Sequence, residues 1–143
     1  MRTLVAISGV LVIATACIGG DTPIRVADQE VTATASRLRL RHIRGHDMVF
    51  GQLTIRGTTQ TLVAANLECF WLTVGPNKSE SIWVDSLIDT LRGDYPARDG
   101  TVSVGVYWAM KDLKTASDAD FEKATLSIKN PFIGPCFKFA SQK

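Results

Sequence analysis

Residues 101–110, which read TVSVGVYWAM, show the pattern that decides the fold class. Large apolar side chains occupy every second position from Val102 to Met110, and the positions between them are mostly small or polar. A period of two places alternate side chains on opposite faces of a β-strand. The pair Asp99–Gly100, which favours a tight turn, directly precedes the segment. The sequence therefore predicts a strand with one buried face.

The same alternation recurs along most of the chain after residue 35. Strand-like runs occur around residues 36–41, 49–56, 61–74 and 126–128, and Gly, Pro, Asn and Asp separate them. Short strands at intervals of about ten residues are typical of an antiparallel β-sandwich or a small barrel. We therefore predict a single, mainly β domain over residues 36–143, with an α+β fold as the alternative.

Two segments favour helices instead of strands. In the first, apolar residues lie at i, i+3, i+4 and i+7, namely Val84, Leu87, Ile88 and Leu91. Gly93 follows at the position of a C-cap, so we predict a short helix over about residues 81–92. A weaker signal begins at Ser117, a possible N-cap for about two turns over residues 117–124.

Composition narrows the classes of function. The chain has 143 residues, of which 45% are hydrophobic and 21% charged, as in ordinary globular domains. Sixteen Lys and Arg against fourteen Asp and Glu leave a net charge of only +2, which disfavours nucleic acid as a partner. None of the motifs G-x-S-x-G, H-E-x-x-H, Walker A or G-x-G-x-x-G occurs. We therefore predict a protein that is not an enzyme and uses no cofactor or metal.

The first residues have the features of an export signal. Arg2 supplies a positive charge, residues 4–13 form a short apolar stretch, and Ala14-Thr15-Ala16 is a small-residue cleavage sequence. The apolar stretch is shorter than the roughly 20 residues that a transmembrane helix needs. We therefore interpret residues 1–16 as a signal peptide. Together with the following Cys17, the cleavage sequence resembles the lipobox of bacterial lipoproteins, with Ala14 where Leu is usual.

This resemblance implies where the protein is located. Cys17 would carry acyl chains such as palmitate, and residues 17–35, which contain Gly-Gly and Pro, would form a lipid-anchored flexible tether. Ile18 follows in place of Asp, which implies an outer-membrane lipoprotein facing the periplasm or the cell surface. The alternative is cleavage after Ala16 without acylation, which gives a soluble periplasmic or secreted protein.

The number of cysteines fits this interpretation. The chain has three, and acylation of Cys17 leaves Cys69 and Cys136 to form a disulfide in an oxidising compartment. The bond would close a loop of 136 − 69 = 67 residues. The alternative is two separate buried thiols.

Arginines are concentrated in the first long strand-like segment. Arg37, Arg39 and Arg41 alternate with Leu38 and Leu40, and Arg44 follows in the next turn. Alternating arginines on one strand face form a positive surface suited to an acidic partner, although such a face can also be merely solvated. We predict a protein-binding module, either a component of an envelope or secretion assembly or an inhibitor or immunity protein against a hydrolase or toxin.

A second function remains open from the sequence. His42, His46 and Met48 lie within seven residues of one another, and His and Met side chains bind copper in oxidising compartments. If the three shared a face, the protein could be a periplasmic carrier of copper or of a small molecule. Gly45 and Asp47 favour a turn between them, which would separate the ligands.

Overall fold

The computed structural model describes residues 23–84, 89–90, 94–111, 113, 116–128 and 135–141. As predicted, the protein is mainly β, and every pair of neighbouring strands is antiparallel. Its largest element is a six-stranded sheet with the order β1 (Ile24–Ala27), β2 (Val31–Ile43), β3 (His46–Gly57), β10 (Thr101–Ala109), β7 (Ser81–Val84) and β8 (Asp89–Thr90).

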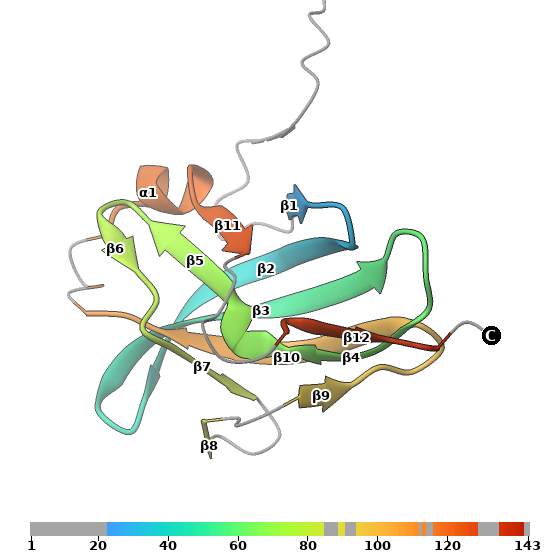
Figure 1. Cartoon of the computed structure of the whole chain (residues 1–143). Coiled ribbons are helices and arrows are strands. Elements are labelled where there is room, and N and C mark those ends of the chain that lie inside the picture. Colours follow the sequence, from blue (N-terminus) through green and yellow to red (C-terminus); the bar gives the residue numbers. More distant parts are fainter. Residues whose placement is uncertain are drawn as a thin grey trace, which may run out of the picture.

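Two three-stranded sheets lie over one face of this large sheet (Figure 1). One has the order β11 (Thr125–Ile128), β5 (Phe70–Val74) and β6 (Asn77–Lys78), and the other β12 (Phe137–Phe139), β4 (Leu62–Asn66) and β9 (Asp94–Pro96). A 3₁₀-helix, η1 (Leu67–Cys69), connects β4 to β5, and one short helix, α1 (Asp118–Glu122), precedes β11. The arrangement is that of a β-sandwich. We call the face of the six-stranded sheet turned away from the small sheets its outward face.

The core lies between the layers and is centred on β10. Val102, Val104 and Val106 are buried on its inner face, as the alternation predicts. Trp108, also on this face, is fully buried, and its indole N–H donates a hydrogen bond to the carbonyl oxygen of Phe70 at 3.3 Å. This bond satisfies the one polar group of the largest core side chain and joins β10 to the opposite layer.

The domain begins earlier than the sequence analysis predicted. Residues 24–27 and 31–35, assigned there to a flexible tether, form β1 and the start of β2, so the boundary at Ser36 is wrong. Val31, Ala33 and Ala35 are each 0% exposed. The segment VTATA has a period of two, but its small side chains make the apolar face inconspicuous. Residues 17–22 of the expected tether and the expected signal peptide lie outside the described residues.

The helix expected over residues 81–92 is also wrong where the structure describes it. Residues 81–84 and 89–90 are strands, and residues 85–88 and 91–93 lie outside the described part. Ile82 and Val84 are each 1% exposed and face the core, while Trp83 between them faces outward. Pairing with β10 and burial of two β-branched side chains outweigh the helical spacing.

The weaker helix prediction and the disulfide are confirmed. Ser117 caps α1 in a capping box, in which its hydroxyl accepts from the Asp120 N–H and the Asp120 carboxylate accepts from the Ser117 N–H. Cys69, at the end of η1, is bonded to Cys136, which lies just before β12. The disulfide therefore joins the two small sheets at their junction.

Candidate partner-binding face

A β-bulge in β2 determines which way the predicted arginines point. The pairing of β2 with β3 shifts between Ser36 and Arg39, so that Arg37 and Leu38 together lie opposite Gly51. Arg37 has a φ of 57°, in the left-handed region. One extra residue exchanges the two faces of a strand. Odd-numbered residues of β2 therefore face the core before the bulge, and even-numbered residues face it after the bulge. As a result, Arg39 and Arg41 face outward.

Gly51 makes room for this bulge. A Cβ built at residue 51 would lie 2.7 Å from Cδ2 of Leu38 and 3.1 Å from Cζ3 of Trp108. Leu38 is only 5% exposed, so its side chain crosses over the position where any other residue would place a methyl group. Because residue 51 is a glycine, β2 can accommodate the extra residue of the bulge while Leu38 stays buried in the core.

Two rows of side chains cross the outward face beyond the bulge. In the first row, Arg39 lies opposite Phe50, Phe50 opposite Tyr107, and Tyr107 opposite Trp83. The rings of Phe50 and Tyr107 are 4.9 Å apart between centroids. Directly opposed residues share a face, so the row runs across four strands. Trp83, at the β7 end of the row, is held in place by a hydrogen bond that its indole N–H donates to Oγ of Ser81 at 3.2 Å.

The second row is shorter and places Arg41 opposite Met48. Met48 and Tyr107 are 1% and 9% exposed, yet neither belongs to the core between the layers. They form a separate apolar group on the outward face, with Phe50 and Trp83 partly exposed beside them. We call the whole set the arginine–aromatic cluster: Arg39, Arg41, Met48, Phe50, Trp83 and Tyr107.

No described acidic side chain neutralises the positive charge of this face. The ion pairs among described residues are His42–Asp47, Lys111–Glu80 and Lys138–Asp94, and none includes an arginine. The outward positions of β1, β2, β3, β7 and β10 carry no Asp or Glu. The guanidinium groups of Arg39 and Arg41 are exposed and free to pair with an external carboxylate.

The four predicted contact residues do not form a single row. Arg39 and Arg41 share the outward face, Arg37 occupies the bulge, and Arg44 lies in the turn at the tip of the β2–β3 hairpin with a φ of 50°. All four are exposed. Leu40, which alternates with these arginines, is 49% exposed because the hairpin extends past the core.

The sequence analysis missed the apolar half of the cluster. Trp83 was assigned to a helix, Met48 was considered only as a metal ligand, and Tyr107 lies between the core positions of β10. The sequence of β2 does contain an indication of the bulge. The apolar residues Val31, Ala33 and Ala35 have odd numbers, whereas the next apolar residue, Leu38, has an even number. Such a change of phase indicates a bulge in β2, and the regular alternation of Val49, Leu53 and Ile55 along β3 places Met48 on the outward face.

The three side chains considered for copper are not gathered. His42 lies opposite Asp47, with its Nδ1 2.9 Å from Oδ1 of Asp47, whereas His46 lies opposite Ile43 on the other face of the hairpin. Met48 is buried within the arginine–aromatic cluster. In the part of the chain that the structure describes, no group of three or more His, Cys, Asp or Glu side chains could hold a metal ion.

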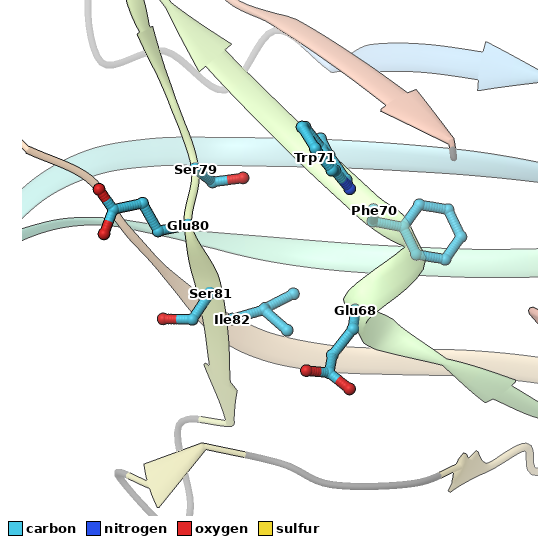
Figure 2. A pocket seen from close by; sticks show the side chains of 7 residues that line it. All are labelled: Glu68, Phe70, Trp71, Ser79, Glu80, Ser81 and Ile82. Atoms are coloured by element: carbon cyan, nitrogen blue, oxygen red, sulfur yellow. The ribbon is translucent and has the colours of Figure 1, made fainter. Parts of the chain in front are cut away.

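A cleft of about 270 Å³ opens where the chain passes from β6 to β7. Figure 2 shows its lining, namely Glu68, Phe70, Trp71, Ser79, Glu80, Ser81 and Ile82. The Ser79 N–H donates to Leu72 in one layer and the Glu80 N–H to Ala109 in the other, so the strand changes layers here. The Ser79 hydroxyl accepts from the Leu72 N–H, and Glu80 pairs with Lys111. These polar groups hold the crossing together.

Comparison with protein-family models, curated proteins and solved structures finds no match to this chain. Among the described residues, no helix is long and apolar enough to cross a membrane.

Proposed function

We propose that this protein is an exported, lipid-anchored envelope protein that acts by binding a protein partner and not by catalysis. The arginine–aromatic cluster is its contact surface, and an acidic surface of the partner is its target. The observation that carries the proposal is that Arg39 and Arg41, which form no ion pair with a described residue, lie beside an outward row of aromatic side chains.

The composition of the cluster is that of a protein-binding site. Arg, Trp and Tyr are the residues most enriched where truncation costs the most binding energy. An arginine beside an apolar surface pairs with a carboxylate where little water competes, which strengthens the pair. The cluster lies on paired strands of a sheet, so few side chains and no backbone must be ordered on binding.

The bulge supports the proposal from another direction. It keeps Arg37 in a left-handed backbone conformation, which is unfavourable for a residue with a side chain. In return it directs Arg39 and Arg41 to the outward face. A strand that only needed a solvated edge would have no need of this arrangement.

A double substitution with a matched control tests the site. A photocrosslinker at the exposed Leu40 identifies the partner in the envelope, and affinity is then measured with the purified partner. We expect Arg39→Ser/Arg41→Ser to weaken binding by about 30-fold or more, since hot-spot residues contribute about 1–2 kcal/mol each. The control Arg25→Ser/Arg56→Ser removes the same charge from the other end of the same face.

The control pair decides between a specific contact and general attraction. A loss confined to Arg39 and Arg41 supports the cluster as the contact surface. Equal losses for both pairs would mean that net charge alone drives association, and no loss for either would remove the cluster from the proposal. If the partner is a hydrolase or toxin, inhibition of its activity on binding distinguishes an inhibitor from a component of an assembly.

The anchor requires a separate measurement. Mass spectrometry of the membrane-extracted protein should find Cys17 as the acylated N-terminus. An intact Met1 in the cytosolic fraction would contradict both export and anchoring.

A further inference from the structure

A second positive site lies on the outward face, at the opposite end of β2 from the arginine–aromatic cluster. A shallow groove of about 440 Å³ is lined by Arg25, Thr32, Thr34, Thr54 and Arg56. Arg25 of β1 lies opposite Thr34, Thr34 lies opposite Thr54, and Thr32 lies opposite Arg56 of β3. The three threonines of β2 and β3 thus line the groove with hydroxyl groups, and Arg25 of β1 and Arg56 of β3 place a guanidinium group on either side. We call this the Arg25–Arg56 groove.

Every charged or polar side chain that lines the groove can donate hydrogen bonds to an anion. Arg56 is oriented by a hydrogen bond from its Nε to Oγ1 of Thr101 at 3.4 Å, which leaves its terminal N–H groups for a ligand. Neither Arg25 nor Arg56 forms an ion pair with a described residue, and the lining holds no carboxylate. Two guanidinium groups and three hydroxyls suit an oxyanion with several acceptor atoms, such as phosphate.

The position of the groove in the chain favours one source of phosphate. β1 begins at Ile24, only 24 − 17 = 7 residues after Cys17. Seven residues of fully extended chain span at most about 25 Å, so an acylated Cys17 keeps the groove close to the bilayer surface. Arg41 lies six ladder positions beyond Thr34 along β2, because the bulge sets Arg37 and Leu38 opposite one residue, and this adds a distance of about 20 Å at the usual rise per residue.

We propose that the Arg25–Arg56 groove binds the phosphate of anionic lipid headgroups, so that the β1 end of the outward face rests against the membrane. The arginine–aromatic cluster then stays clear of the bilayer for the protein partner. This inference rests on the lipid anchoring in the proposed function. It assigns two roles to one sheet face: membrane contact near the anchor and partner contact at the far end of the hairpin.

Vesicle binding tests the groove without the anchor. The processed chain from residue 17, carrying Cys17→Ser, contains every described residue and cannot be acylated. We expect it to sediment with vesicles of phosphatidylcholine and phosphatidylglycerol and not with phosphatidylcholine alone. Arg25→Gln/Arg56→Gln should lower the partition coefficient by about 30-fold, equivalent to about 1 kcal/mol for each basic side chain at an anionic surface.

The matched control is Arg39→Gln/Arg41→Gln, which removes the same charge about 13–20 Å further along β2. At about 0.1 M salt this distance exceeds the Debye length, so the control should change partition by less than about threefold. Equal losses for the two pairs would overturn the proposal. If the Arg25→Gln/Arg56→Gln variant does not fold, Thr34→Asp is the second test. It places a carboxylate in the groove while both arginines are kept, and it should abolish vesicle binding.

Inorganic phosphate distinguishes the two sources of the ligand. At constant ionic strength, replacing chloride by phosphate should leave the protein on the anionic vesicles. Release that depends on Arg25 and Arg56 would show a site for free phosphate and overturn the membrane contact. Because Cys17→Ser is present throughout, a negative vesicle result leaves acylation untouched, and the mass spectrum of the native protein tests that separately.

Discussion

Replacing Gly51 with alanine tests the bulge on which the orientation of the arginines depends. The new methyl group would lie 2.7 Å from Cδ2 of Leu38, 3.1 Å from Cζ3 of Trp108 and 3.2 Å from the carbonyl oxygen of Ser36. Trp108 is fully buried and Leu38 nearly so, which leaves little room for either to move. Inserting a methyl group into such a site costs about 1–3 kcal/mol. The smaller backbone entropy of unfolded alanine offsets about 0.5–1 kcal/mol.

We therefore expect Gly51→Ala to lower the free energy of unfolding by about 1–2 kcal/mol, measured by urea denaturation with fluorescence detection. The same substitution is then made in a Leu38→Ala variant, which lacks the closest obstacle. Leu38→Ala by itself should lower the free energy of unfolding by about 2–4 kcal/mol. In that background Gly51→Ala should cost at least about 1 kcal/mol less, so the double-mutant cycle reports a coupling between the two sites.

Two results would refute the bulge. If Gly51→Ala were neutral or stabilising in the otherwise unchanged protein, no side chain would cross position 51. If its cost were the same with and without the Leu38 side chain, Leu38 would not lie against position 51, where the bulge places it, and β2 would continue in regular alternation. In the second case Arg39 and Arg41 would face the core, and the proposed contact surface would lose its basis.

Three further changes have expected effects that can be measured on the purified protein. Removing the disulfide with Cys69→Ala/Cys136→Ala should lower the free energy of unfolding by about 4 kcal/mol, the loop-closure contribution for 67 residues; a drop below about 1 kcal/mol would contradict this. Gly45→Val should cost more than about 1 kcal/mol, because residue 45 has a φ of 81°, and Gly45→Asn should cost clearly less. Ser117→Ala should cost about 1 kcal/mol, and an unchanged thermal midpoint would show that the cap of α1 contributes nothing.

The parts of the fold that were predicted correctly depend on short-range patterns. The alternation in residues 101–110 correctly indicated the central strand, and Ser117 correctly indicated the start of the helix because a capping box is encoded within four residues. The disulfide followed from the number of cysteines and from the compartment implied by the leader. None of these inferences required knowledge of which strands are neighbours.

The failures involve long-range pairing. Residues 81–84 begin the segment predicted to be a helix but form a strand because β10 lies beside them, and β10 is about 25 residues further along the chain. The arginine–aromatic cluster collects residues from four strands and depends on a shift of one residue in register. Arg37, which adopts the left-handed backbone conformation, is not one of the residue types that usually mark it. Only the change of phase in the apolar positions of β2 indicated the bulge.

The bulge also limits how the length of the β2–β3 hairpin can change. Deleting Arg37 would remove the extra residue and restore strict alternation, and the inner and outer sides of the remaining hairpin would stay as they are. Leu38 would then be the one residue opposite Gly51 and would stay on the inner side, while Arg39 and Arg41 would stay on the outer side. Deleting or inserting two residues, one in each strand beside the Arg44–Gly45 turn, would likewise shorten or lengthen the hairpin with its sides unchanged. In related chains, a hairpin that is shorter by one residue should therefore lack the bulge, and other differences in hairpin length should be even.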